Sequence, residues 1–419
     1  MNSKISLLMA AVVLQSGCAT LSGTSDTSKE RNDFIDVAAF PDWFQQAMKR
    51  ESDDETTSVL DIHYYNINTP VKGEITLLYE DERLLNYAID FGADAPAECY
   101  VIYEHSGLSN TLNKLTDVQI ATVAENNQKD LVNRLTWALN VGMVTDTPYL
   151  SLDTLLTLEA DGERVLGMVK SRAAQTNDSL QACFHNSVGY RDSFDAVFES
   201  FVSAFTDGET SPEFFENIVT LSLADRTIGY AREKYTLDAD GDIAGTKDTA
   251  LLIPVDPGNL MSSDSKVLSW ARTDGTLINQ FNTSVDNGEL SSRYLIQNDG
   301  AQWQVEGELQ KKPIAATLDY QGPLVSDYGH YLKYVDLLNS EAPELSVYGW
   351  VAEADPTSAM EIRLEKADAA DHNMVMYAGP LTVNFIANED GTSETGSLTQ
   401  GPVVFSYQKI YQKGEPQLP

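Results

Sequence analysis

The sequence predicts an α+β protein that is rich in antiparallel sheet and carries a few amphipathic helices in its N-terminal half. Asp-Gly dipeptides recur between strand-like runs, and these dipeptides tolerate the positive φ angles of tight hairpin turns. The 19 tyrosines, several of them in those runs, suit pleated surfaces that are wet on one side. Helical periodicity is clear only in a few stretches, most of them in the N-terminal half.

The chain starts with a stretch that is typical of a secretory signal. Lys4 supplies a positive charge, and the apolar run Ile5–Leu14 follows it. This run is too short to span a bilayer, which needs a helix of about 20 residues. We therefore expect residues 1–17 to be a signal peptide that is removed on export.

The end of this signal suggests a lipid anchor. Ser16-Gly17-Cys18 resembles the lipobox of bacterial lipoproteins, although Gln15 stands where an aliphatic residue is usual. The resemblance implies that Cys18 becomes the new N-terminus and carries acyl chains such as palmitate. Ala19 after the cysteine then favours the outer membrane, with the protein facing the periplasm or the surface. The alternative is an ordinary secretory signal that is cut nearby, with Cys18 incidental.

Composition limits both the structure of the segment after the signal and the partners of the chain. Residues 18–33 are rich in Ser, Thr and Gly, cannot bury enough apolar surface to fold, and should form a flexible tether. The net charge of the chain is −35. This charge disfavours nucleic acid and anionic lipid headgroups as partners, because both need Lys and Arg. A cationic partner or divalent ions fit the charge, and so does a simple solvated acidic surface.

Residues 34–240 are predicted to form a mixed α+β region. Its strand-like runs are Leu60–Ile67, Glu74–Glu80 and Glu98–Glu104. Its helix-like runs are Trp43–Arg50 behind a capping Asp42, then Thr116–Asn140, Asp192–Phe205 and Ser211–Leu221. The second of these is the clearest, because its apolar residues repeat near helical spacing with no Pro or Gly between them. Those residues are Val118, Ala121, Leu131, Leu135 and Leu139.

Residues 241–419 are predicted to be mostly antiparallel sheet joined by hairpins. The expected turns are Asp240-Gly241, Asp274-Gly275, Asp286-Asn287-Gly288, Asp299-Gly300 and Asp390-Gly391. Leu381–Ala387 and Val403–Tyr411 are the predicted strands on either side of the last turn. Asp161-Gly162 and Asp207-Gly208 are turns of the same kind in the N-terminal half.

One weak internal similarity crosses both regions. Cys99–Leu115, Cys183–Val202 and Thr317–Leu338 each resemble a strand, a polar loop and a helix-like stretch. This pattern indicates either a repeated unit or a common strand-loop-helix arrangement.

Cys99 and Cys183 are the cysteines that remain beside Cys18. Two cysteines in an oxidising compartment favour a disulfide. Closing a loop of this length is worth about 4 kcal/mol in the chain-entropy model. The alternative is two buried thiols that behave as small apolar groups.

Two short motifs resemble a calcium-binding loop and a catalytic Ser-Lys pair. Asp238, Asp240 and Asp242 would be the ligands if calcium binds, but the glycine spacing departs from a calcium loop and favours a hairpin turn. Ser263 and Lys266 fit the Ser-x-x-Lys motif of penicillin-binding proteins, yet the Lys-Thr-Gly element of that family is absent from the sequence.

The histidines give no zinc spacing, since none lies three or four residues from another. His105 and His185 stand close to serines where strands are predicted to end in loops. Active sites often use such places, so a Ser-His-acid site could assemble there from distant residues. A structural role is the favoured interpretation for each histidine.

No residue stands out as catalytic, cofactor-binding or metal-binding. We therefore expect a non-enzymatic lipoprotein of the cell envelope that binds or assembles a protein, a glycan or a lipid and is held to the membrane by its lipid. The alternatives are a periplasmic or surface hydrolase of glycan, peptide or ester and a calcium-stabilised adhesion factor. A hydrolase should show a pocket where a Ser-His pair or two carboxylates converge, and a binding protein should show a groove or an aromatic patch.

Overall fold

The computed structural model describes residues 33–62, 67–176, 179–206, 212–400 and 403–418. The predicted signal, Cys18 and the tether up to residue 32 lie outside these residues, as does the predicted Asp207-Gly208 turn. The described chain forms two compact units. The N-terminal unit comprises residues 33–206 and 252–262, and the C-terminal unit comprises residues 212–251 and 263–418. The predicted boundary between the mixed region and the β region, at residue 240, lies inside the C-terminal unit.

The predicted antiparallel, β-rich class is confirmed, because every pairing between named strands in the described residues is antiparallel. Helices are few, and they are not restricted to the N-terminal half, since α5 (Asp327–Asn339) lies in the C-terminal unit. None of the helices in the described part of the chain combines the length and the apolarity that crossing a bilayer requires.

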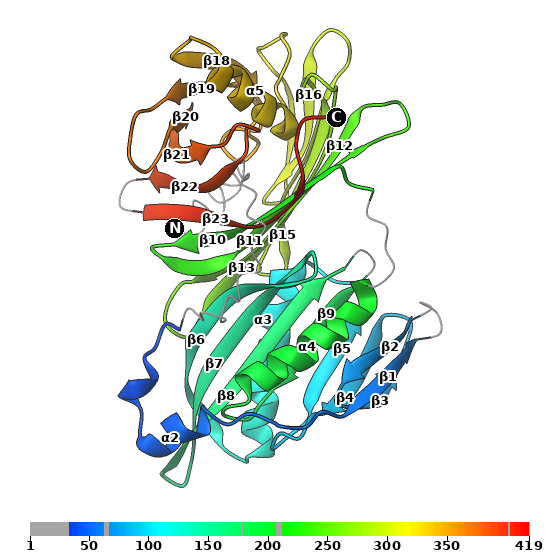
Figure 1. Cartoon of the computed structure of the whole chain (residues 1–419), viewed down its shortest axis with the longest axis vertical. Coiled ribbons are helices and arrows are strands. Elements are labelled where there is room, and N and C mark those ends of the chain that lie inside the picture. Colours follow the sequence, from blue (N-terminus) through cyan, green and yellow to red (C-terminus); the bar gives the residue numbers. More distant parts are fainter. Residues whose placement is uncertain (1–32, 63–66, 177–178, 207–211, 401–402, 419) are drawn as a thin grey trace. The chain divides into compact units, whose positions relative to one another are not determined.

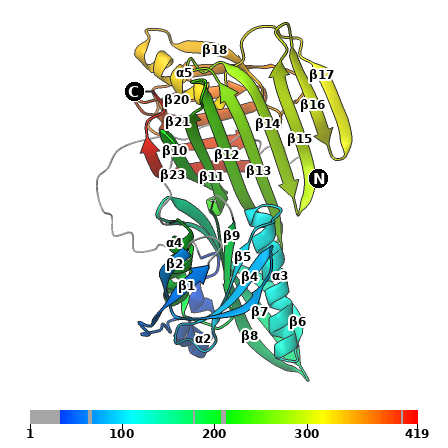
Figure 2. The ribbon, with the colours of Figure 1, turned by 90° about the vertical axis from the view of Figure 1, so that its right-hand side faces the viewer.

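The N-terminal unit is a sheet with a helix on each face (Figures 1 and 2). Its first elements are η1 (Val37–Ala39), α2 (Asp42–Ala47), β1 (Thr57–Ile62), β2 (Ile67–Lys72), β3 (Glu74–Glu80), β4 (Leu84–Asp90) and β5 (Ala97–Ile102). The others are α3 (Leu108–Asn126), β6 (Asp130–Val144), β7 (Thr147–Ala160), β8 (Glu163–Gln175), β9 (Leu180–His185) and α4 (Arg191–Thr206). The sheet order is β3-β4-β5-β9-β8-β7-β6, and β1 and β2 form a separate ribbon. Central strand β7 is buried at ten consecutive positions because both faces are covered.

The predicted helix Thr116–Asn140 is wrong in its second half. Helix α3 ends at Asn126, and Gln128 adopts a left-handed φ of 53° that turns the chain into strand β6. The apolar residues near the break do not form a buried stripe, since Val118 is 57 % exposed and Leu131 is 41 % exposed. Further along β6, the four consecutive residues Thr136 to Leu139 are all buried, and the strand pairs with β7 along its length.

The predicted helix Ser211–Leu221 is also wrong, because Phe215–Leu223 forms strand β10. Ile218, Val219 and Thr220 are β-branched and suit a pleated sheet better than a helix. The predicted helix Asp192–Phe205 is confirmed as α4, whose phenylalanines pack on the sheet beside the ribbon of β1 and β2.

The C-terminal unit is a long antiparallel sheet that curls around α5 (Figures 1 and 2). Its first strands are β10, β11 (Arg226–Leu237), β12 (Ile243–Pro254), β13 (Leu260–Ala271), β14 (Leu277–Asp286), β15 (Glu289–Asn298), β16 (Trp303–Leu309) and β17 (Lys312–Thr317). After α5 come β18 (Glu344–Gly349), β19 (Met360–Lys366), β20 (Met374–Ala378), β21 (Leu381–Ala387), β22 (Ser393–Gln400) and β23 (Val403–Gly414). The strand order follows the sequence from β17 back to β10, then runs from β23 back to β18.

Helix α5 fills the concave side of this curl and contacts both arms of the sheet. The ring of Tyr331 lies 5.3 Å from that of Phe215 on β10, and the ring of Tyr334 lies 5.2 Å from that of Phe385 on β21. Val325, just before the helix, forms single β-bridges to Thr276 and to Gly349, which belong to opposite arms. The helix and its preceding segment therefore hold the curl in shape.

The hairpin turns predicted from Asp-Gly and Asn-Gly occur where expected. Gly162, Gly241, Gly275, Gly288, Gly300 and Gly391 all have positive φ angles between paired strands. The predicted strand after Asp390-Gly391 is displaced, however. The turn leads into β22, and Val403–Gly414 follows as the next strand, β23. The sequence Ser393–Gln400 is rich in Ser, Thr and Gly and is typical of a loop.

The N-terminal unit also buries a cluster of charges between its sheet and α4. Arg172 on β8 donates to Asp153 at 2.8 Å and to Asp195 at 2.7 Å, and Arg191 donates to Asp153 at 2.7 Å. Burial alone would raise the pKa of the Asp153 carboxyl, but the two arginines outweigh it and hold that pKa far below its usual range. Each of these charges has an opposite partner, so the cluster fixes α4 to the sheet.

Cys99 on β5 and Cys183 on β9 form the predicted disulfide. The two residues are directly opposite each other in the sheet, and their Cα atoms lie 4.1 Å apart. Both are fully buried beneath α4.

Replacing both cysteines (C99A/C183A) is expected to lower the free energy of unfolding by about 4 kcal/mol, because the bridge closes a separation of 84 residues in the unfolded chain. Urea denaturation of the oxidised wild type and the double variant measures this. The oxidised and reduced wild type should differ in the same direction, and equal midpoints for all three proteins would contradict the prediction.

Candidate functional site

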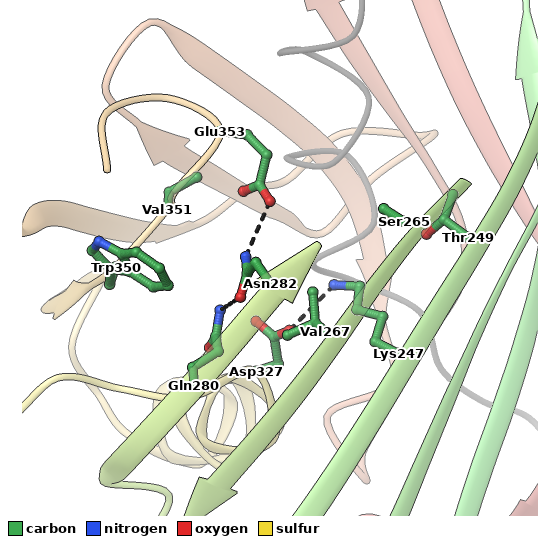
Figure 3. A pocket seen from close by; sticks show the side chains of 10 residues that line it. All are labelled: Lys247, Thr249, Ser265, Val267, Gln280, Asn282, Asp327, Trp350, Val351 and Glu353. Carbon is green, nitrogen blue, oxygen red and sulfur yellow. Dashed lines mark hydrogen bonds and ion pairs between the residues drawn. The ribbon is translucent and has the colours of Figure 1, made fainter. Parts of the chain in front are cut away.

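A polar hollow opens on the concave side of the C-terminal unit, where three neighbouring strands meet the start of α5 (Figure 3). Alternate residues of β12, β13 and β14 point to the same side of the sheet and form one wall. Asp327 at the first turn of α5 and the segment after β18 form the rest. The lining residues are Lys247, Thr249, Ser265, Val267, Gln280, Asn282, Asp327, Trp350, Val351 and Glu353.

Lys247 is the positive charge of the hollow. Its Nζ lies 3.3 Å from a carboxylate oxygen of Glu233 on β11 and 3.4 Å from one of Asp327. Glu233 and Lys247 are direct cross-strand partners, and the Tyr331 hydroxyl donates to Glu233 at 2.6 Å. Burial opposes the charge on Lys247, but Asp327 and Glu233 outweigh it and raise the pKa of the ammonium. Lys247 therefore stays charged and neutralises the buried start of α5.

Two amide side chains continue the polar lining from Lys247 toward Glu353. Gln280 donates through Nε2 to the Asn282 carbonyl oxygen at 2.8 Å, and Asn282 donates through Nδ2 to Glu353 at 3.2 Å (Figure 3). Burial raises the pKa of the Glu353 carboxyl, although the hydrogen bond from Asn282 acts in the opposite direction. These two hydrogen bonds therefore fix the orientation of Glu353. They also fix the directions of the amide N–H and C=O groups of Gln280 and Asn282 that lie outside these two bonds.

The indole of Trp350 borders the same space and is itself held in place. Its Nε1 donates to the Pro356 carbonyl at 3.0 Å, and its ring meets Tyr294 edge to face with ring centres 6.4 Å apart. The hollow is partly open, and its inner space measures about 20 Å³. This is room for water or for a small polar end group such as a hydroxymethyl group, and it is too small for a whole sugar ring or a peptide segment.

His330 lies one helical turn from the hollow and has no hydrogen-bond partner for either ring nitrogen. It is buried and stacks on Tyr334, with ring centres 6.4 Å apart. Burial lowers the pKa of His330 to about 4, with Lys247 acting in the same direction and Asp327 against it. The imidazole is therefore neutral in the folded protein at pH 7.

The sequence motifs for catalysis do not assemble into sites. Ser263 and Lys266 lie on strand β13 three residues apart, so they point to opposite faces of the sheet. The Ser263 hydroxyl donates to Asp286 at 2.7 Å instead. Asp238 accepts hydrogen bonds from the backbone amides of Asp240 and Asp242, which makes this segment the predicted hairpin turn. No group of three or more His, Cys, Asp or Glu side chains among the described residues is placed to hold a metal ion.

His105 and His185, the two histidines near serines, contact backbone groups and aromatic rings. His185 is fully buried, its Nε2 lies 3.1 Å from the Ala95 carbonyl, and it packs against the rings of Phe91 and Phe194. The Nδ1 of His105 accepts a hydrogen bond from the backbone amide of Gly107 at the start of α3. Neither borders the hollow in the C-terminal unit.

The residues that form the hollow were not identified from the sequence. One signal was available: β14 contains buried amides at Gln280 and Asn282, with Phe281 between them. Amides at two-residue spacing on a buried face indicate a polar wall, because buried polar groups need partners. The contributions of Asp327 and Glu353 depend on contacts between distant segments and leave no local pattern.

No protein-family model matches the chain, and no curated protein matches it. One similar solved structure is a crystal structure of a β-barrel-like protein of domain of unknown function DUF1849 from Brucella abortus. The TM-score is 0.39 and the sequence identity is 11 %, over 49 % of this chain and 99 % of that chain.

Replacing His330 by Phe (H330F) is expected to weaken the acid sensitivity of the C-terminal unit. The unfolded histidine takes up a proton near pH 6.5 and the folded one only near pH 4. Its contribution to stability is therefore complete above pH 6.5 and declines as the pH falls to about 4, by about 3 kcal/mol in total. Denaturant unfolding of wild type and variant from pH 7.5 to 4 measures the difference. Parallel curves would contradict the prediction.

Proposed function

We propose that this chain is an envelope lipoprotein that binds a glycan without chemically changing it, using the polar hollow for an end group of the sugar. The observation that carries the proposal is the row of fixed hydrogen-bonding side chains on β12, β13 and β14 beside Trp350. Pre-oriented donors and acceptors next to an aromatic ring suit a hydroxylated ligand, whose groups both donate and accept.

The lining favours a glycan over the other expected ligands. Seven of the ten lining residues carry polar or charged side chains, which disfavours an acyl chain. Lys247 faces the carboxyl groups of both Asp327 and Glu233, so the hollow has no spare positive charge to attract an anionic ligand.

The first test replaces Asn282, the central amide, by Ala (N282A). We expect at least tenfold weaker binding, because the variant removes one hydrogen bond to the ligand and releases Glu353 from its fixed orientation. Isothermal titration calorimetry with chitotetraose, cellotetraose and maltotetraose measures this. These three neutral tetrasaccharides differ in linkage and in N-acetyl groups.

The matched control is Gln297→Ala, which removes an exposed amide from neighbouring strand β15. Its affinity should equal that of the wild type. If the wild type binds none of the three sugars, or if N282A binds as tightly as the control, the hollow is not a glycan site.

A hydrolase is the second candidate, and one observation favours it. Asp327 and Glu353 are two carboxyl groups on one hollow that has room for water, and burial raises the pKa of Glu353, as a general acid requires. The calorimetry samples also decide this question. New reducing ends that appear with wild type and not with Glu353→Gln would replace the binding proposal by hydrolysis.

We also propose that lipid on Cys18 holds the protein at the outer membrane. This rests on the signal-like residues 1–17, the lipobox-like Ser16-Gly17-Cys18 and Ala19. Replacing Cys18 by Ala should move the protein from the membrane fraction to the soluble fraction of fractionated cells, and metabolic labelling with an alkyne fatty acid should label only the wild type. A variant that stays in the membrane fraction and is still labelled would contradict the proposal.

A further inference from the structure

The N-terminal unit has an open depression of about 610 Å³ beside α2. It lies among α2, the loop that follows β9, and the turn between β4 and β5. Trp43, Gln46, Arg50, Asp94, Ser187 and Val188 line it. It is wide and open, and its volume far exceeds that of the hollow in the C-terminal unit.

Trp43 presents an aromatic surface at this depression. Its side chain is 55 % exposed, whereas the adjacent Phe44 is fully buried. The two rings meet edge to face with centres 5.6 Å apart, so the buried phenylalanine positions the exposed indole. An exposed indole that is held by the core beneath it can bind an apolar ring face at little cost in conformational entropy.

Arg50 and Asp94 form a fixed, neutral polar pair next to the indole. The guanidinium donates to Asp94 at 2.6 Å and to the Val188 carbonyl at 2.8 Å, and it lies 5.1 Å from the ring centre of Tyr190. The Tyr190 hydroxyl donates to the other Asp94 oxygen at 3.2 Å. Guanidinium donors and carboxylate acceptors therefore stand side by side, and both side chains are about half exposed, at 42 % and 52 %.

The loop under this pair is held rigidly. The Tyr190 amide donates to the Arg50 carbonyl at 2.5 Å, and Gly189 has a φ of +85°, where a Cβ atom would come within 2.2 Å of the Ala47 carbonyl. On the buried side of the loop, Nζ of the fully buried Lys170 donates a hydrogen bond to the Ser187 carbonyl. The donors and acceptors of the depression are therefore set before any ligand arrives.

From this arrangement we propose that the depression is a second glycan site, which binds a neutral sugar ring with its apolar face on Trp43. The sugar hydroxyls bind the Arg50–Asp94 pair, and the exposed amide of Gln46 and the Ser187 hydroxyl are within the same lining. Asp94 cancels the charge of Arg50, which disfavours anionic ligands. This inference rests on the proposed glycan function and extends it, because it gives the chain a second place to bind the same class of ligand.

The test uses the full mature chain and the same three tetrasaccharides in calorimetry. The wild type should show two sites per chain for the tightest sugar. Trp43→Ala should remove one of them, and Asp94→Asn should weaken that same site while keeping the indole. The control is Trp270→Ala, a partly exposed tryptophan on β13 that should leave the affinity unchanged. Because Trp43 and Asp94 are exposed, both variants are expected to unfold at the wild-type temperature.

Comparison with N282A separates the two proposals. Loss of one site in Trp43→Ala and of the other site in N282A supports both proposals. A Trp43→Ala variant that keeps the wild-type number of sites and affinities overturns the second site, and an N282A variant that does so overturns the hollow as a glycan site. A wild type that binds none of the three sugars overturns both.

Discussion

The C-terminal unit depends on how the concave face of its curled sheet is covered. A sheet of this length must bury one face, and α5 is the element that fills the curl. Its tyrosines contact strands of both arms, but its first turn brings Asp327 into the interior with it. Lys247 on β12 forms ion pairs with both Asp327 and the neighbouring Glu233. The polar hollow is thus a consequence of closing the curl with a helix whose start is charged.

Turn chemistry made most of the C-terminal sheet predictable. Asp-Gly and Asn-Gly mark positive φ angles that few other dipeptides tolerate, so they locate hairpins from local sequence alone. Strand β22 was missed because Ser393–Gln400 carries few apolar residues, and its pairing with β21 and β23 decides its structure. The helix predicted over Thr116–Asn140 failed for a related reason. Apolar residues on both sides of the break at Gln128 continue a helical spacing by coincidence, while burial in the sheet selects the strand.

The candidate sites were less predictable than the fold. Gln280 and Asn282 leave a trace in the sequence as buried amides at strand spacing, but Asp327 and Glu353 join them only through the path of the chain around the curl. At the Trp43 depression, Arg50 and Val188 are 138 residues apart and meet through one hydrogen bond. No local pattern in the sequence contains such contacts. The contrast between exposed Trp43 and buried Phe44 also becomes visible only in the structure.

The strand order also constrains when the chain can fold during synthesis. Strand β10 pairs with β23, so its partner leaves the ribosome only after some 180 further residues. Until β23 emerges, the edge of β10 that will pair with it stays open. The arm from β18 to β22 is then not yet joined to the rest of the sheet, because β23 forms that junction. Such long sequence separations make folding slow and expose strand edges to aggregation. A chaperone that holds unpaired strands would therefore act mainly between the emergence of β10 and that of β23.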